Sequence, residues 1–153
     1  MPTDAAHDIP AYFAACAAAH AASALFMAGV VWFVQVVHYP LMRRVNPERF
    51  AAFMEEHGRR TGWVLAPITA VEALTGLCLR YEVASTLLTW NLVLLGAAWA
   101  STLFVQLPQY RRLMEGHHAE TLNKLIRWNL LRTLAWTAHA AAALAILWNA
   151  LNH

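Results

Sequence analysis

Charged residues are scarce in this chain, at only 13% of its 153 residues. Hydrophobic residues make up 59%, and the mean hydropathy is +0.41. An average soluble domain carries about 25% charged residues, so this composition excludes an ordinary soluble fold. It predicts an integral membrane protein whose principal partner is the lipid bilayer.

Several motifs that would carry chemistry are also missing. Cys16 and Cys78 form no CxxC or Cys/His spacing, so the sequence predicts neither a zinc motif nor a disulfide framework, and we expect both to be small packing residues. There is no Gly-rich phosphate loop, no GxSxG elbow and no cysteine beside a helix N-terminus with a histidine partner. Hydrolytic and nucleotide-driven activities are therefore poor interpretations.

Long apolar runs are what the chain does have. A bilayer core about 30 Å thick needs about 20 apolar residues per helix. Four segments qualify, roughly 11–38, 61–80, 84–107 and 125–150, and they leave almost no sequence for a soluble domain. We therefore predict one all-α membrane domain over residues 1–153, built as a four-helix bundle.

The basic residues gather in two of the three connections between these segments. By the positive-inside rule both connections are cytoplasmic and both termini lie outside, as in a multi-pass protein of a bacterial inner membrane. The basic balance is thus a topology signal, and no nucleic-acid partner is predicted. These residues are Arg43, Arg44, Arg49, Arg59 and Arg60 in the first connection, and Arg111, Arg112, Lys124 and Arg127 in the third.

Tryptophan residues follow the same two-sided order. Two aromatic belts, one at each membrane surface, are typical of membrane-spanning helices. Trp32, Trp63 and Trp128 lie toward the cytoplasmic ends of their segments, and Trp90 and Trp148 lie toward the outer ends. We expect these five side chains to mark the two membrane boundaries.

Proline punctuates the first two segments. His38-Tyr39-Pro40 predicts the end of the first helix, because proline lacks an N–H and restricts the residue before it. Asn46-Pro47-Glu48 predicts a helix start, with an N-cap followed by proline at the first helical position. The amphipathic pattern over 47–60 then predicts an interfacial helix that runs into the second span.

The second half of the chain echoes the first at an offset of about 71 residues. Phe33-Val34-Gln35 with Tyr39 and Pro40 resembles Phe104-Val105-Gln106 with Pro108 and Tyr110. Such an echo indicates two tandem helix-pair repeats related by an axis along the membrane normal. A short match of this kind leaves both duplication and coincidence open.

Polar residues recur at helical spacing inside the apolar segments, where they are costly and therefore point to a functional interior. Counting depth at about 1.5 Å per residue places them in two layers. The first layer, in the cytoplasmic third, contains Gln35, His38, Gln106, Asn129 and Arg132. The second, near mid-membrane, contains Glu72 and His139, with Asn91 and His20 further out.

Arg132 requires an anionic partner, because it stays charged among Trp and Leu residues about two turns inside its helix. Glu72 is the only acidic residue inside a predicted span, so a buried Arg132–Glu72 pair is one interpretation. An anionic or quinone-like ligand is the second. A side chain that extends to the lipid headgroups is the third.

The histidines also allow three interpretations. His38, His57 and either His117 or His118 would converge on a metal ion, and His with Glu72 suits Fe, Cu or Zn. Alternatively, His20 and His139 would ligate a haem b between facing helices, as would His38 with another histidine. In the third interpretation the histidines are hydrogen-bonded packing residues.

The motif Val105-Gln106-Leu107-Pro108 leads through Arg112-Leu113 to Trp128-Asn129 and Leu131-Arg132-Thr133. In these motifs the chain resembles small four-helix bacterial membrane proteins that are distantly similar to the anthrone-oxygenase-like family. Members of that family carry a Pro-containing polar motif after helix three and a Trp and an Arg on helix four. The resemblance implies oxidation of an aromatic, quinol-like substrate inside the membrane, with His38, Asn129 and Arg132 in the site.

These observations predict a membrane-embedded oxidoreductase, or a metal- or haem-binding protein, acting on a lipophilic quinol-like or aromatic substrate. His38, Glu72 and Arg132 are the candidate catalytic residues. The candidate substrate-binding residues are Gln35, Gln106, Asn129 and Trp136.

Two other functions compete with this one. The first is a proton-coupled transporter with a relay through His139, Glu72 and His20, which we expect to be a homo-oligomer because four helices enclose little volume. The second is an accessory subunit of a membrane complex, whose polar stripes pair with partner helices.

Overall fold

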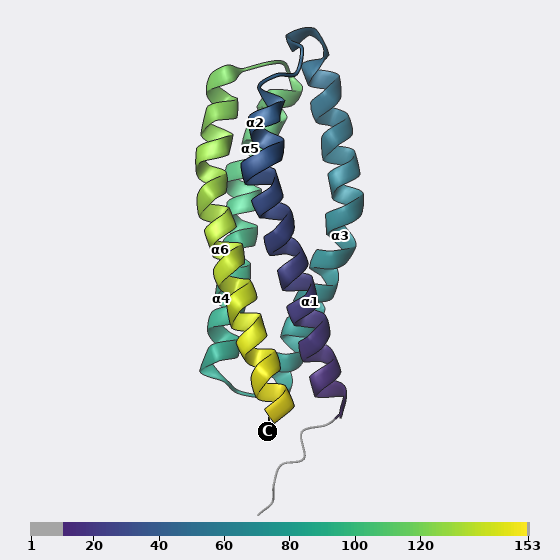
Figure 1. Cartoon of the computed structure of the whole chain (residues 1–153), viewed down its shortest axis with the longest axis vertical. Helices are drawn as coiled ribbons and strands as arrows, with labels where there is room; N and C mark the ends of the chain where they lie inside the picture. The colour runs from purple at the N-terminus through teal and green to yellow at the C-terminus, as the bar shows by residue number, and fades with distance from the viewer. Residues whose placement is uncertain (1–10, 153) are drawn as a thin grey trace, which may run out of the picture.

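The computed structural model describes residues 11–152, and within this range every regular element is a helix. Four helical rods lie alongside one another, each long and apolar enough to cross a membrane (Figure 1). The predicted all-α four-helix bundle is confirmed.

The rods follow one another up and down the bundle. They consist of α1 (Ala11–Phe33), η1 (Val34–His38) and α2 (Tyr39–Met42); η2 (Pro47–Arg49) and α3 (Phe50–Glu82); α4 (Thr86–Ser101), η3 (Thr102–Gln106) and α5 (Leu107–Met114); and α6 (Ala119–Asn152). The connections after α2 and α5 share one end, here named the basic end. The α3–α4 connection, the start of α1 and the end of α6 share the opposite end.

The first and third rods are longer than predicted, because neither helix stops at its proline. The N–H of Tyr39 donates to the Val34 carbonyl, and the N–H of Leu107 donates to the Thr102 carbonyl. Each of the two rods therefore makes a π-helical turn just before its proline, Pro40 or Pro108. The widened turn relieves the clash between a proline ring and the preceding turn. The spans are Tyr12–Met42 and Thr86–Met114 instead of 11–38 and 84–107.

The second rod begins as predicted, and its first part runs on into the span. Asn46 caps it, its Oδ1 accepting from the Glu48 N–H at 2.9 Å, and Pro47 follows. The short helix η2 leads directly into α3, and Phe50 and Met54 in the first turns of α3 are buried inside the bundle. Its apolar face therefore packs against other helices.

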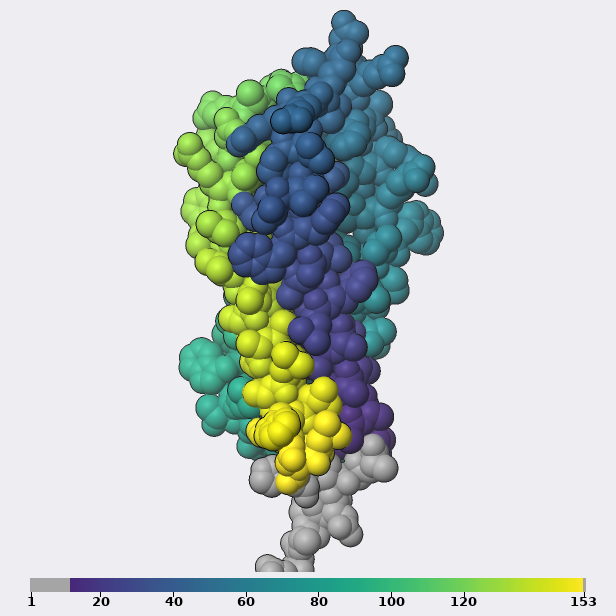
Figure 2. Space-filling model, in the orientation of Figure 1, coloured from purple at the N-terminus to yellow at the C-terminus, as the bar shows by residue number. Residues whose placement is uncertain are grey.

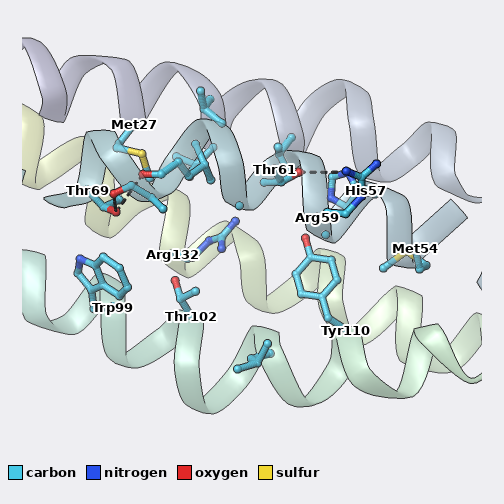
Figure 3. Close-up of a pocket in the computed structure, with 18 of the residues that line it drawn as sticks. Met27, Met54, His57, Arg59, Thr61, Thr69, Trp99, Thr102, Tyr110 and Arg132 are labelled. Carbon is cyan, nitrogen blue, oxygen red and sulfur yellow. Dashed lines mark hydrogen bonds between the residues drawn. The ribbon is translucent and has the colours of Figure 1, made fainter.

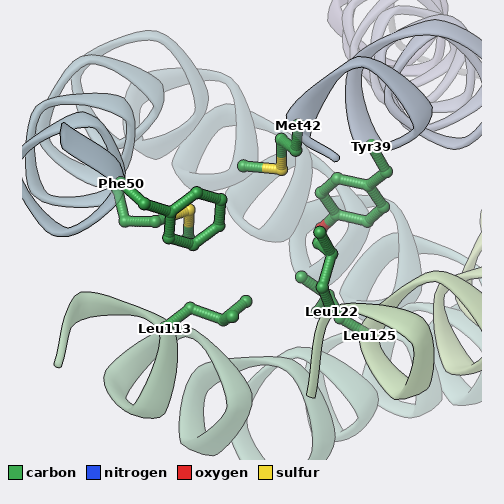
Figure 4. Packing of buried hydrophobic residues seen from close by; sticks show 7 residues of the cluster. Tyr39, Met42, Phe50, Leu113, Leu122 and Leu125 are labelled. Carbon is green, nitrogen blue, oxygen red and sulfur yellow. The ribbon is translucent and has the colours of Figure 1, made fainter. Parts of the chain in front are cut away.

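Apolar clusters close the two ends of the bundle. The cluster at the basic end, drawn in Figure 4, consists of Tyr39, Met42, Phe50, Met54, Leu113, Leu122 and Leu125. Phe13, Ala17, Leu79, Leu88 and Ile146 form the cluster at the opposite end. Between these ends α1 and α6 pack through alanines, whose small side chains let two helices approach closely. The two helices touch directly along the face shown in Figure 2.

The outer surface of the bundle suits lipid. Large apolar side chains such as Leu74, Leu77 and Phe104 are well exposed. Trp128 and Trp148 are both exposed on α6, twenty residues apart, which is about 30 Å along a helix and about the thickness of a hydrocarbon core. The molecule is therefore described as a multi-pass membrane protein, and the side of the membrane that its basic end faces stays a prediction.

Candidate functional site

One polar residue from each rod meets at the centre of the bundle. These four residues, here named the polar node, are His20, Glu72, Asn91 and His139, and each is 0% exposed. His139 Nε2 lies 2.9 Å from Glu72 Oε1, and His20 Nε2 lies 2.8 Å from Asn91 Oδ1. The residues predicted near mid-membrane are thus in direct contact.

Backbone groups complete the network. Asn91 Nδ2 donates to the His139 carbonyl at 3.1 Å, and His139 Nδ1 donates to the Asn91 carbonyl at 3.1 Å. His20 Nδ1 lies 3.0 Å from the Glu72 carbonyl oxygen and 3.2 Å from Thr75 Oγ1. Buried polar groups are costly without partners, so these bonds fix how the four rods fit together.

The interpretation of Arg132 and Glu72 as an ion pair is wrong. Glu72 pairs with His139, and no salt bridge joins Arg132 to an acidic residue within 11–152. Arg132 precedes His139 by seven residues on α6, which places it about 10 Å closer to the basic end. The carboxylate and the guanidinium therefore lie at different depths.

The geometry does not fit a haem between His20 and His139 either. Their rings meet edge to face, with centroids 5.4 Å apart and an interplanar angle of 87°. All four ring nitrogens already have hydrogen-bond partners in the polar node. A haem iron needs a free nitrogen from each side, so these rings are instead packing and hydrogen-bonding groups.

The predicted metal site at His38, His57 and His118 is also not formed. The rings of His38 and His57 stack face to face, with centroids 4.4 Å apart, and His117 packs edge-on against Phe50. Stacked rings do not aim their nitrogens at one point. In the part of the chain that the structure describes, no three His, Cys, Asp or Glu side chains are grouped so as to hold a metal ion.

A cavity of about 520 Å³ lies beside the polar node, toward the basic end (Figure 3). All four rods contribute to it, and its walls are mainly apolar and aromatic. Wall residues with apolar side chains include Met27, Val31, Leu65, Trp99, Leu107 and Trp136, and those with polar side chains include His57, Thr61, Thr69, Thr102, Tyr110 and Arg132. Of the predicted substrate-binding residues, only Trp136 lies in the wall.

Arg132 is the distinctive polar group of this cavity. Its guanidinium points into the space between α3 and the α4–α5 rod (Figure 3). Its Nε is buried and has no hydrogen-bond partner among the described residues. Arg59 also lines the cavity, but its guanidinium is paired with Glu56. A buried donor without a partner costs free energy, so this cavity favours a ligand with an acceptor oxygen or an anionic group.

The predicted residues Gln35, Asn129 and Gln106 do not line the cavity. Asn129 Nδ2 donates to Gln35 Oε1 at 2.7 Å, and Gln35 Nε2 donates to the Ile126 carbonyl at 3.3 Å. Gln106 is fully buried, and its Nε2 has no partner among residues 11–152. Gln35 and Asn129 therefore join η1 to α6.

Residue-type reasoning missed the hydroxyl pair of Tyr39 and Tyr110, which are hydrogen-bonded to each other where Tyr110 enters the cavity wall. The offset of about 71 residues between the two halves could have predicted this contact. Tyr39 and Tyr110 are 71 residues apart, and so are the bonded His20 and Asn91. Equivalent residues of two parallel halves meet when they lie near the axis between them. A common origin of the halves stays a prediction.

The fold and the site together define a four-helix membrane protein with a largely apolar interior cavity, in which Arg132 forms no salt bridge within residues 11–152 although Glu55 also lines the wall. Comparisons of the chain with family models, curated proteins and solved structures found no match.

Proposed function

We propose that this protein binds a lipophilic small molecule with an oxygen-bearing head, of the quinol, quinone or related aromatic class. The observation that carries the proposal is the Arg132 guanidinium, whose buried Nε lacks a partner in a largely apolar cavity of about 520 Å³. A volume of this size and an apolar lining with few polar groups are typical of small-molecule sites.

The walls of the cavity match such a ligand in two ways. Arg132 presents a planar set of donors that suits a carbonyl, phenolate or carboxylate oxygen. Trp99 and Trp136 offer flat aromatic surfaces, and Met27 offers an adaptable one, which suits a ring or an alkyl tail. A purely hydrocarbon ligand would leave the Arg132 Nε without a partner and is disfavoured.

The α3 wall supports entry from the lipid. Gly58, Gly62 and Ala66 succeed one another at intervals of four residues along α3, and all three line the cavity. Gly62 and Ala66 are exposed on the surface of the bundle, next to the exposed Trp63. A ligand dissolved in the bilayer would pass between α3 and the α4–α5 rod without displacing a large side chain.

The resemblance to anthrone-oxygenase-like proteins supports an oxidoreductase role for this binding site. In that role the cavity holds the aromatic ring, and Arg132 holds the oxygen on which charge develops. A bacterial inner-membrane location, with the basic end in the cytoplasm, completes the proposal and would open the cavity toward the cytoplasmic half of the bilayer.

The transporter alternative is less well supported. Its three relay residues, His20, Glu72 and His139, are indeed linked through the polar node. Toward the opposite end, however, the core consists of alanine and larger apolar side chains, which would interrupt a proton path. The accessory-subunit alternative and a homo-oligomeric state stay predictions.

Ligand binding to the purified protein in lipid nanodiscs tests the proposal. The probe is an alkyl-substituted hydroxynaphthoquinone, detected by quenching of tryptophan fluorescence, and the matching alkylnaphthalene is the control ligand. We expect saturable binding of the quinone and weaker binding of the hydrocarbon. Equal affinity for both would contradict a role for Arg132 as the anchor.

A second test compares a variant that blocks the cavity entrance with a control variant in which the same substitution lies outside the cavity. A Cβ added at Gly62 meets no atom within 4 Å, and the same is true at Gly96, which does not line the cavity. Gly62→Leu should fill the entrance and weaken quinone binding at least tenfold, about 1.4 kcal/mol. Gly96→Leu should bind like the unmodified protein. Unchanged binding by Gly62→Leu would place the ligand elsewhere.

A further inference from the structure

The hydrogen bonds of the polar node fix where its protons lie. The Asn91 carbonyl can only accept, so the Nδ1 of His139, 3.1 Å away, carries a hydrogen. The contact of 2.9 Å between His139 Nε2 and Glu72 Oε1 then contains one further proton. That proton belongs either to an imidazolium facing a carboxylate or to a carboxylic acid facing a neutral imidazole. In both cases the Glu72–His139 pair holds it.

The same reasoning assigns the protons of His20. Asn91 Nδ2 donates to the His139 carbonyl, which leaves Asn91 Oδ1 as an acceptor and makes His20 Nε2 a donor. His20 Nδ1 faces both the Glu72 carbonyl oxygen and the Thr75 hydroxyl. It can donate to the first, or accept from the second when the Thr75 hydroxyl turns away from the Val71 carbonyl, to which it donates at 2.7 Å.

One atom of the polar node remains unsatisfied. Glu72 Oε2 is buried and has no hydrogen-bond partner among the described residues. A carboxylate oxygen without a partner has free lone pairs, so a proton can bind there. Glu72 thus offers a place for a second proton next to the one that it already shares.

The polar node adjoins the cavity through two residues of the cavity wall. Thr69 lies one turn before Glu72 on α3, Trp136 lies one turn before His139 on α6, and both line the cavity. The Trp136 ring meets the His139 ring edge-on, with centroids 5.7 Å apart. Toward the opposite end the core is apolar. The charged group nearest along α6 is Arg132, two turns away.

We infer that the Glu72–His139 pair is a proton-binding site that takes up one proton when an anionic ligand occupies the cavity. This inference rests on the proposed binding function. The ligand oxygen bears the negative charge beside Arg132, and an O–H bond forms at Glu72 Oε2. The ligand anion neutralises Arg132, whose positive charge in the ligand-free protein opposes a further proton on the pair, because a like charge disfavours protonation. The proton comes from the ligand hydroxyl or from solution.

Calorimetry of probe binding to the full-length protein tests the inference. The ring hydroxyl of the hydroxynaphthoquinone is acidic, so at neutral pH the probe arrives as an anion. Titrations in two buffers of different ionisation enthalpy give the number of protons taken up. We expect one proton per bound probe for the unmodified protein and none for Glu72→Gln. Glu82→Gln, an exposed acid on the same helix, should retain the uptake of one proton.

The outcomes separate the two proposals. Binding of the probe without proton uptake by the unmodified protein would overturn the inference and leave the proposed function intact. Absence of binding would contradict the proposed function, and infrared spectroscopy of the ligand-free protein would then decide the proton site. There we expect a carboxylic-acid C=O band that grows on acidification, shifts in D₂O and is missing in Glu72→Gln. No such band at any pH at which the protein stays folded would overturn the site.

Discussion

The polar node and the cavity are neighbouring parts of one bundle interior. They differ in whether their buried polar groups have hydrogen-bond partners. In the node nearly every donor and acceptor of His20, Asn91 and His139 is paired with a group from another rod. In the cavity the Nε of Arg132 is buried without a partner. The difference indicates that the node holds the rods in register, whereas the cavity can bind a ligand that supplies the missing hydrogen-bond partner.

Removing a member of the node should have the largest effect on stability. His139→Ala leaves Glu72 Oε1 and the Asn91 carbonyl without their imidazole partners, and breaking a buried pair typically costs about 3–5 kcal/mol. Thermal unfolding in detergent should show a large loss for this variant and almost none for Glu82→Gln. A loss of the same small size in both variants would mean that the node does not hold the bundle together.

Arg132→Leu should show the converse pattern. Arg132 is half-buried and its Nε has no partner among residues 11–152, so replacing it by an apolar residue should leave the thermal stability unchanged or raise it. Quinone binding should fall about 10- to 100-fold, because a hydrogen bond to a charged group contributes roughly 1.5–3 kcal/mol. Arg127→Leu, an exposed position on α6, is the matched control. A strongly destabilised Arg132→Leu would show that the arginine is structural.

Gly76→Ala should have an intermediate effect that reports on packing around the node. A Cβ at Gly76 would lie 2.9 Å from His20 Cε1 and 3.0 Å from Leu92 Cδ2, so the His20 ring would have to move. Overpacking of this kind costs about 1–3 kcal/mol. Gly96→Ala has open space around its added atom and should not be destabilised. If both variants unfold at the same temperature, His20 does not pack against α3 as described.

Cross-linking the two cysteines should have the smallest effect. This experiment tests only how α1 and α3 are placed relative to each other. Cys16 Sγ and Cys78 Sγ lie 3.9 Å apart. A mild oxidant that removes two electrons and two protons should join them within one chain, with little change in probe binding. Mass spectrometry after alkylation should detect the link and should find none in Cys78→Ser. Failure to form it under conditions that oxidise a control dithiol would contradict the α1–α3 packing.

Much of the fold was predictable because it depends on composition and chain direction. Apolar runs of sufficient length predict the spans, and the two basic connections predict that they share one end. The helix end predicted at Pro40 was wrong, because proline stops a regular α-helix but a π turn accommodates it, as a second π turn does before Pro108. The spacing of residues alone does not distinguish these two responses.

For the candidate site, the level of each residue along its helix could be predicted from the sequence, but the orientation of its side chain could not. Counting residues along each span placed Glu72 and His139 at one level, and they do meet. It did not show that His38 and His57 stack, because that depends on side-chain orientation. The cavity itself arises where side chains fail to fill the space between α3 and the α4–α5 rod. Such a gap leaves no pattern in a single sequence.

Photolabelling is the most direct test that the cavity beside Arg132 is a ligand site. An azido-substituted alkyl quinone would be irradiated with the protein in nanodiscs, and the labelled residues would be identified by mass spectrometry. The binding proposal predicts labels on the cavity walls, at residues such as Met27, Thr102 and Trp136, that excess unlabelled quinone removes. Labels spread evenly over exposed residues such as Leu74, Leu77 and Phe104, unaffected by competitor, would contradict it.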